Sequence, residues 1–213
     1  MHALRLGEIE KVLCLGAHAD DIEIGCGGSI LRLLEEHPGL SVRWVVLGAA
    51  GVRAREASES AGKILRKAGE KDVIVRGFPD GRFPHHWDEI KTELHEIVGG
   101  FSPDVIFTPR LEDRHQDHRL VAELAWTVFR DHWILEYEIP KYEGDLVTPN
   151  LYVPLSAEVC RQKLRFLVDG FPSQHEKPWF TEETFRSLLR IRGIECNSPS
   201  GYAEGFTCRK LCV

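Results

Sequence analysis

Short apolar runs recur along the chain, and each is followed by a longer stretch with amphipathic spacing. The first run, 12–16, is compact and ends in glycine, which is typical of a buried strand. The same criterion predicts the remaining strands at 42–47, 73–75, 105–108, 134–139 and 151–153.

The stretches between these runs place their apolar residues on one helical face. Within 53–68, for example, Ala57, Ala61, Ile64 and Leu65 form a single stripe. Helices are predicted at 29–36, 53–68, 87–98, 117–130, 157–168 and 182–192, with a closing loop at the end of the chain.

Strands that alternate with helices at this spacing indicate βαβ units and a parallel sheet. Right-handed crossovers then give a doubly wound arrangement. We therefore expect a single α/β domain over residues 1–213, a Rossmann-like three-layer fold with a mainly parallel sheet. The segment from about 140 to 213 is expected to complete the rim of a site.

The net charge of −6 argues against nucleic acid as the main partner, because phosphate binding needs a basic surface. No apolar run approaches the roughly 18 residues of a membrane span. Residues 1–11 are polar and mixed in charge, unlike a signal peptide. The six cysteines form no CxxC pair, so buried thiols are expected rather than disulfides. These features predict a cytoplasmic protein with a small-molecule substrate.

The densest chemistry follows the first and fourth predicted strands. Residues 17–23 read AHADDIE, and residues 113–118 read DRHQDH. Ligands of such sheets bind at the carboxyl ends of the strands, so both loops are expected at one rim. A catalytic zinc site needs three nitrogen or oxygen ligands and one open position for water.

Three of these side chains can face one point. His18 and Asp21 lie three residues apart on a loop that enters a helix, and His118 can supply the third ligand. Asp20 then lies beside the metal without binding it, as a general base should. Zinc is inferred from the ligand types, and iron(II) or cobalt could bind the same trio.

The second loop offers an acid–base group as well. His115 precedes His118 by three residues and can reach the same centre. Asp117 is expected to fix the tautomer of His115 and to keep it protonated.

Each motif also has an ordinary structural interpretation. An isolated HxxD pair is usually a surface loop with a capping aspartate, and HxDH can be a solvated helix N-cap. Their joint occurrence at the ends of two predicted strands favours a metal site. Gly25, Gly27 and Gly28 lack the GxGxxG spacing of a nucleotide-binding loop and are interpreted as allowing close helix–sheet packing.

The two motifs resemble those of the LmbE-like/PIG-L family of zinc-dependent N-deacetylases, which carries (P/A)HPDDxE after its first strand and HxDH after its fourth. The resemblance spans nearly the whole chain and continues in the segments RAREA (53–57), FPDG (78–81), SQ (173–174) and YAEGF (202–206). One departure is Ala19, where the family usually has proline; proline there would only stiffen the loop.

The resemblance implies roles for the residues of the first motif and for their partner from the second. His18, Asp21 and His118 match the zinc ligands, and Asp20 matches the general base.

It also implies roles for residues around them. His115 matches the group that stabilises the oxyanion and can protonate the leaving amine, with Asp117 behind it. Arg53 and Asp80 match positions that hold sugar hydroxyls, although a solvated helix residue and a turn residue are equally good interpretations.

The activity implied is removal of an N-acetyl group from an N-acetylglucosamine-type sugar or its conjugate, giving acetate and a free amine. One alternative is a zinc amidase for a larger acyl group or a thiol conjugate, since acyl size would be set by the variable loops 78–88 and 139–150. Another is a non-catalytic Rossmann-like ligand-binding domain. Members of the family are often multimers, so a homo-oligomer is among the states to expect.

Overall fold

The strands of the protein form one seven-stranded sheet in the computed structural model, which describes residues 9–211. The structure does not describe residues 1–8 or 212–213. The first range holds most of the segment that does not resemble a signal peptide, and the second includes Cys212. The strands are β1 (Lys11–His18), β2 (Ser41–Gly48), β3 (Glu70–Val75), β4 (Val105–Pro109), β5 (Trp133–Tyr137), β6 (Leu151–Pro154) and β7 (Ala203–Cys208).

The order of the strands creates a crevice next to β1. Across the sheet they run β3-β2-β1-β4-β5-β7-β6, and β1 to β5 are all parallel. Val12 of β1 is paired with Val42 on one side and with Val105 on the other. The chain moves outward from β1 to β3 and then returns to β4, so the connections diverge between β1 and β4. Ligands of doubly wound sheets bind at this switch point.

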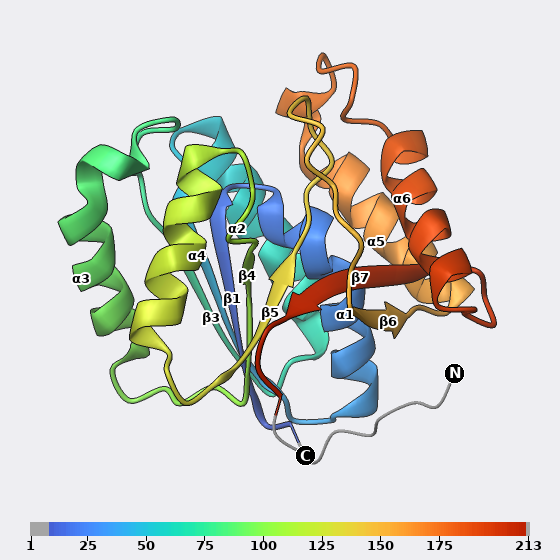
Figure 1. The fold of residues 1–213 in the computed structure, drawn as a ribbon, viewed down its shortest axis with the longest axis horizontal. Helices are drawn as coiled ribbons and strands as arrows, with labels where there is room; N and C mark the ends of the chain where they lie inside the picture. The colour runs from blue at the N-terminus through green and yellow to red at the C-terminus, as the bar shows by residue number, and fades with distance from the viewer. Residues whose placement is uncertain (1–8, 212–213) are drawn as a thin grey trace.

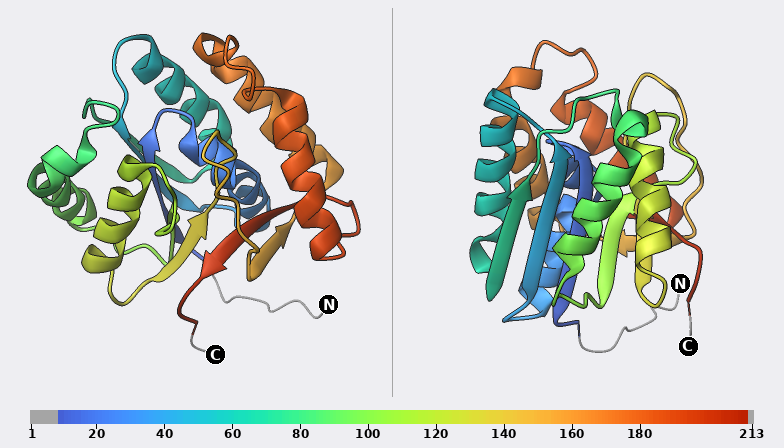
Figure 2. Two further views of the ribbon diagram at one scale, coloured as in Figure 1. Left: turned by 45° about the horizontal axis from the view of Figure 1, so that its top comes forward. Right: turned by 90° about the vertical axis from the view of Figure 1, so that its left-hand side faces the viewer.

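Helices cover both faces of the sheet, which confirms the three-layer Rossmann-like expectation (Figures 1 and 2). Helices α3 and α4 pack on one face, while α1, α2 and α5 pack on the other with α6 beyond them. The helices are α1 (Asp21–Glu36), α2 (Val52–Ile64), α3 (Trp87–Val98), α4 (Gln116–Val128), α5 (Ala157–Gly170) and α6 (Glu182–Glu195), with short 3-10 turns η1 (Leu65–Lys67), η2 (Phe83–His86) and η3 (Pro172–Gln174).

Strand β1 runs through the centre of the sheet and is covered on both faces. Val12 and Cys14 belong to the core under α1 and α2, whereas Leu13 and Leu15 belong to the core under α3 and α4. A strand buried on both faces needs a continuous apolar run rather than an alternating one. This requirement explains why 12–16 could be recognised from the sequence.

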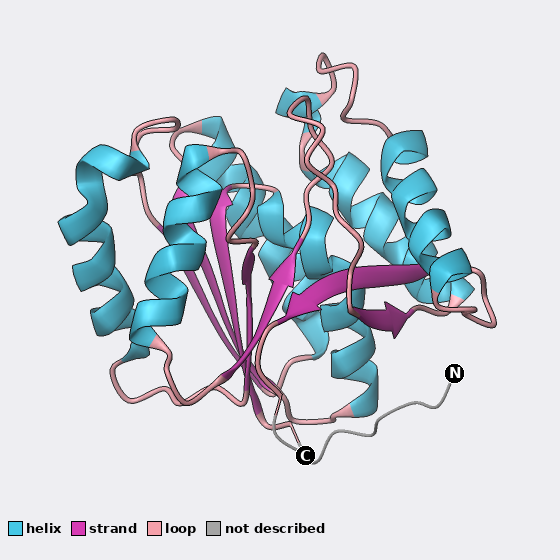
Figure 3. Cartoon of the chain, viewed as in Figure 1, coloured by secondary structure: helices cyan, strands magenta, loops and turns pink. Residues whose placement is uncertain are grey.

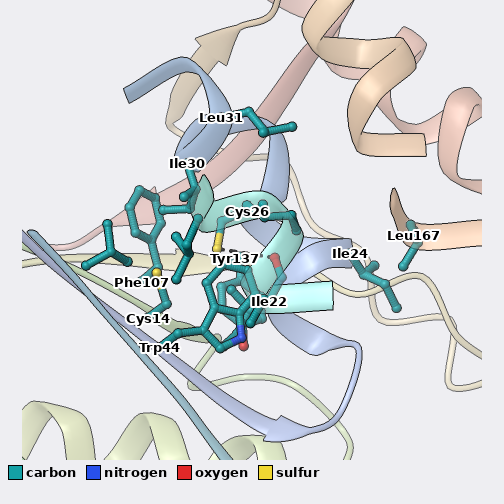
Figure 4. Close-up of a cluster of buried hydrophobic side chains, with 14 of the residues drawn as sticks. Cys14, Ile22, Ile24, Cys26, Ile30, Leu31, Trp44, Phe107, Tyr137 and Leu167 are labelled. Atoms are coloured by element: carbon teal, nitrogen blue, oxygen red, sulfur yellow. Dashed lines mark hydrogen bonds between the residues drawn. The ribbon is translucent and has the colours of Figure 1, made fainter. Parts of the chain in front are cut away.

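Two of the three glycines of α1, Gly25 and Gly28, allow the close packing that was predicted, whereas Gly27 has no close neighbour. A Cβ at Gly25 would lie 2.2 Å from Tyr137 of β5, and a Cβ at Gly28 would lie 2.5 Å from Leu155. Figure 4 shows Tyr137 among Ile22, Cys26 and Ile30 of this helix. Glycine disfavours helix by about 1 kcal/mol per residue, which is why the sequence predicted a helix only from residue 29, eight residues late.

Residues 203–208 form a strand, β7, within the segment that the sequence predicted to be a closing loop. Strand β7 lies antiparallel between β5 and β6 (Figure 3). Its Glu204 turns a carboxylate onto α1, where it accepts hydrogen bonds from the backbone N–H groups of Gly28 and Ser29 at 2.8 and 2.6 Å. The sequence did not predict this strand because the segment is short and contains Glu204 and Gly205, two residue types that are depleted in strands. Such residues occur in a strand where tertiary packing favours them.

Two further expectations concern helices and thiols. None of the helices within residues 9–211 combines the length and hydrophobicity that a membrane crossing requires. Cys14 and Cys26 are buried, as predicted, and all five cysteines of the described part are free thiols.

Two substitutions in α1 test the close approach of the helix to β5. Gly25→Ala places a methyl group against the Tyr137 ring, so we expect the free energy of unfolding to fall by about 1–3 kcal/mol. Gly27→Ala is the matched control, because the nearest neighbouring atom to its Cβ would lie 3.9 Å away, and alanine favours helix by about 1 kcal/mol. Denaturant unfolding measures both, and equal stability of the two variants would contradict the packing described.

Candidate functional site

The two motifs meet at the carboxyl edge of β1 and β4, beside the crevice. His18 is the last residue of β1, and Asp21 is the first residue of α1. His118 lies in the first turn of α4, which follows β4 after a short loop. The sheet therefore brings together side chains that are 100 residues apart in the sequence.

The three predicted ligands present one donor atom each to a common point. His18 Nδ1 lies 3.1 Å from His118 Nε2, and Asp21 Oδ2 lies 3.3 Å from His118 Nε2 and 3.6 Å from His18 Nδ1. A tetrahedral zinc site with ligand distances of about 2.0–2.1 Å places its ligand atoms about 3.3 Å apart. The three separations bracket that value, so these atoms fit one small cation.

The electrostatics of the site favour positive charge at this point. Burial lowers the pKa of His118, but Asp21 and Asp113 outweigh it and raise that pKa to about 9. Burial likewise opposes the charged form of His18, yet Asp21 and its other carboxylate partners raise its pKa well above the usual value. Burial raises the pKa of Asp21, while His118 and His18 hold it well below its usual range. A field that stabilises imidazolium also stabilises a bound cation.

Each imidazole is oriented by carboxylates on its far nitrogen. His18 Nε2 lies 3.0 Å from Asp80 Oδ1 and 3.2 Å from Asp117 Oδ2. His118 Nδ1 lies 3.0 Å from Asp113 Oδ2. Carboxylates of this kind fix the tautomer and ring orientation of metal-binding histidines. When the ring is neutral, its proton lies on this far nitrogen, and the near nitrogen keeps a lone pair for a metal.

The carboxylate of Asp117 does not contact His115 as the sequence analysis expected. It accepts hydrogen bonds from the backbone N–H groups of Gly81 at 2.6 Å and Phe83 at 3.1 Å, in addition to its contact with His18. Successive helical residues point about 100° apart, so residues two apart, such as the N-cap His115 and Asp117, point in nearly opposite directions. The main-chain N–H of Asp117 donates to His115 Nδ1 at 3.3 Å instead.

His115 lies beside the predicted ligands, and its Nε2 lies 3.9 Å from Asp80 Oδ1. Its ring centroid is 4.8 Å from that of His18 and 4.8 Å from that of His118. The Asp117 N–H occupies Nδ1, so the neutral ring carries its proton on Nε2. Burial, then the neighbouring His118 and His18, lower the pKa of His115. The structure therefore favours a neutral His115 and not the protonated form that the sequence analysis expected.

Asp20 is buried next to Asp21, and its partner is Arg53. Arg53 Nη2 donates to Asp20 Oδ1 at 2.7 Å, and Arg53 Nη1 donates to Glu56 at 3.2 Å. Burial raises the pKa of Asp20, and Arg53 partly opposes this rise. Ser173 donates its N–H and its hydroxyl to Glu56 at 2.8 and 2.6 Å, so the C-terminal segment braces the arginine.

Other side chains at this place could also hold a metal. The sets His18/His115/His118 and His18/Asp80/His115/Asp117 each have one donor atom per residue within 4.8 Å of the others. Asp21 makes the tighter set with His18 and His118, since its oxygen is within 3.6 Å of both imidazoles. Asp80 is 77% exposed and contacts the far nitrogen of His18, whereas Asp117 is already engaged by two backbone amides.

Three residues that orient the site were not assigned roles from the sequence. Asp113 orients His118, Lys141 contacts Asp113, and Glu56 holds Arg53. Two of them lie in motifs that the sequence analysis quoted: Glu56 is the glutamate of RAREA, and Asp113 is the first aspartate of DRHQDH. Nothing in the sequence pointed to Lys141, because its contact with Asp113 spans 28 residues and depends on how a loop folds.

Comparison with known proteins identifies the family. Residues 13–129, more than half of the chain, match the sequence profile of the PIG-L family, described as GlcNAc-PI de-N-acetylase. An uncharacterized deacetylase of Escherichia coli K12, YaiS, is 36% identical over 141 residues, which cover 61% of this chain and 74% of that protein. The chain belongs to the PIG-L, or LmbE-like, family of deacetylases.

Solved structures share the fold. The N,N'-diacetylchitobiose deacetylase of Pyrococcus horikoshii is 24% identical, with a TM-score of 0.69 over 94% of this chain and 84% of that chain. GalB of Pseudomonas putida KT2440, a 4-carboxy-2-hydroxymuconate hydratase, is 18% identical, with a TM-score of 0.73 over 96% of this chain and 98% of that chain. The fold therefore serves more than one reaction, and the chemistry must be argued from the site.

Asp117→Asn tests whether this carboxylate orients His18. The variant weakens the hydrogen bond to His18 Nε2, so we expect zinc affinity to fall about 10–100-fold. Competition with a chromophoric chelator measures the affinity. Gln116→Ala is the matched control, because Gln116 also contacts Gly81, at 3.3 Å, but is not bonded to His18. An Asp117→Asn protein that binds zinc as tightly as the control would contradict the orienting role.

Proposed function

We propose that this PIG-L family deacetylase is a zinc-dependent hydrolase that removes the N-acetyl group of an N-acetylglucosamine-type sugar or of its conjugate. The observation that carries the proposal is the convergence of His18, Asp21 and His118 on one point, with separations of 3.1–3.6 Å. Two nitrogens and one oxygen match the ligand types of catalytic zinc and leave a fourth position open.

The buried carboxylates support a metal at this place. A divalent ion held there supplies Lewis-acid activation of water and of the amide carbonyl. Asp21, Asp113 and Asp117 bring negative charge to the same small volume, and burying such charges is costly unless they are paired. The two imidazoles, already oriented by Asp113 and Asp117, are the nitrogen ligands.

Asp20 is the general base in this proposal. It adjoins the ligand Asp21, and the observed hydrogen bond from Arg53 fixes its carboxylate without using its second oxygen. That oxygen takes a proton from the attacking water as a new bond forms to the amide carbon. The proton then passes to the amine nitrogen as the C–N bond breaks, which yields acetate and the free amine.

His115 and Asp117 act at different points in the same reaction. The Nε2–H of neutral His115 donates a hydrogen bond to the oxyanion that develops on the carbonyl oxygen. Asp117 acts indirectly, by holding His18 and by fixing the His115 tautomer through its main-chain N–H.

Sugar recognition is assigned to residues at the rim. Asp80 offers an exposed carboxylate beside His115, and Arg53 keeps about a quarter of its side chain exposed. Both can bind sugar hydroxyls, and the segment 140–213 contributes to this rim through Ser173, which braces Arg53 by way of Glu56. Free thiols in the described part support a reducing compartment, the cytoplasm.

Asp20→Ala separates the proposed chemistry from metal binding. Removing the base should lower kcat about 10²–10⁴-fold while zinc content stays near one per chain. Asp88→Ala, which removes an exposed acidic residue from the first turn of α3, should keep kcat unchanged. Steady-state kinetics with metal analysis measures both quantities, and a fully active Asp20→Ala enzyme would eliminate this base.

A substrate panel tests the proposed reaction itself. We expect metal-loaded protein to release free amine and acetate from N-acetylglucosamine or its glycosides, and chelator treatment to abolish the release. His115→Ala should lower kcat about 10²–10³-fold, since it removes one oxyanion donor. Turnover of only longer N-acyl or thiol-conjugate substrates would favour the larger-acyl amidase. A protein that neither binds zinc nor cleaves any amide would favour the ligand-binding domain.

A further inference from the structure

A buried group of charges lies behind His118, on the side away from the proposed metal. The side chains of Asp113, Lys141 and Asp145 are only 1%, 8% and 5% exposed. Lys141 Nζ lies 2.9 Å from Asp113 Oδ2 and 2.8 Å from Asp145 Oδ1. Asp113 Oδ2 is the oxygen that also contacts His118 Nδ1, at 3.0 Å. One carboxylate oxygen therefore joins a lysine to a proposed metal ligand.

The remaining contacts make Asp113 the centre of the second loop. Its other oxygen accepts the backbone N–H of His115 at 2.8 Å. Asp113 thus holds both the ring of His118 and the main chain that leads to His115. A displacement of Asp113 would move two of the side chains used by the proposed reaction.

Lys141 belongs to a different part of the chain, the loop 138–150 between β5 and β6. This loop rises beyond the carboxyl end of β5 (Figure 1). It is anchored to the second motif by Asp145, whose carboxylate accepts the backbone N–H of Arg114 at 2.7 Å. It is anchored to α6 by Arg192, which donates to the carbonyl oxygen of Val147 at 2.8 Å. Lys141 is therefore held in a fixed position.

The charge of Lys141 matters most when the imidazole serves as a ligand. A metal-bound imidazole is neutral, so it gives Asp113 a hydrogen bond but no positive charge. Asp113 then remains a buried carboxylate that needs a cation, because an unpaired buried charge is strongly destabilising. Lys141 is the side-chain cation in direct contact with that carboxylate.

We infer that Lys141 is a positioning residue of the metal centre: through Asp113 it holds His118 in the orientation that ligates the metal, and it couples the loop 138–150 to that centre. The inference rests on the proposed metal site. The same loop carries the exposed side chains of Tyr142 and Leu146. A change in the conformation of this loop should therefore alter metal binding.

Lys141→Met in the chain of residues 1–213 is the direct test. The methionine retains the length and apolar stem of lysine without its charge. Partners of a metal-binding histidine typically contribute 10–100-fold to metal affinity. Lys141 acts one contact further away, so we expect its loss to weaken zinc binding about tenfold. Chelator competition measures the affinity, and thermal unfolding of the metal-free protein shows whether the variant is folded.

A double-mutant cycle with Asp113→Asn identifies the route of the effect. If Lys141 acts through Asp113, Lys141→Met should change zinc affinity less than twofold in the Asp113→Asn background. Effects that multiply in the double variant would overturn the inference. Lys163→Met is the matched control, since Lys163 is equally buried and pairs with Glu204, away from His118. It should alter stability but leave zinc affinity near that of the wild type.

The outcomes separate this inference from the proposed function. A wild-type protein that binds no divalent metal contradicts the proposed function. A wild-type protein that binds zinc, together with a folded Lys141→Met variant of equal affinity, contradicts only the role of Lys141. If Lys141→Met does not fold, Lys141→Gln, which retains a hydrogen-bond donor, should weaken zinc binding in the same direction, and unchanged affinity in that variant would overturn the inference.

Discussion

The close approach of two imidazole nitrogens and one carboxylate oxygen is the constraint on which the rest of the site depends. Three polar atoms with mutual separations of 3.1–3.6 Å are costly to bury without a cation or a proton among them. The parallel sheet makes the approach unavoidable, because β1 and β4 are neighbours and end at the same edge. The switch in strand order keeps the space above that edge clear of a crossing connection.

Around this point, carboxylates alternate with histidine, arginine and lysine side chains. Carboxylates orient the histidines from behind, and two cations, Arg53 and Lys141, pair with the carboxylates of Asp20 and Asp113. Arg53 belongs to α2 and is braced by Ser173 through Glu56, whereas Lys141 belongs to the loop after β5. Segments distant in sequence therefore contribute to the geometry of the centre even where they supply no ligand.

Much of the fold and the ligand set could be predicted because local patterns determine them. Buried parallel strands require continuous apolar runs, and a ligand pair such as His18 and Asp21 is set by spacing at a strand–helix junction. The sequence-based predictions were wrong where tertiary contacts override the local secondary-structure preference of the residues. Helix α1 begins at Asp21 despite its glycines, because these glycines admit Tyr137 and Leu155.

The contacts behind the ligands were harder to predict. The position of Asp117 in the first turn of α4 sets the direction of its side chain, which contacts His18 and not His115, two residues before it in the sequence. Strand β7 was missed because Glu204 is stabilised by α1 and not by its own segment. Lys141 acts across a loop whose path no periodicity encodes. These are contacts between distant segments, and one sequence carries no direct record of them.

Anomalous diffraction from zinc-loaded crystals tests the central claim most directly. Data on either side of the zinc absorption edge locate the ion without reference to activity. The account predicts one peak within about 2.0–2.2 Å of His18 Nδ1, Asp21 Oδ2 and His118 Nε2. A peak held by Asp80 and His115, or imidazoles of His18 and His118 that bind no common ion, would contradict it.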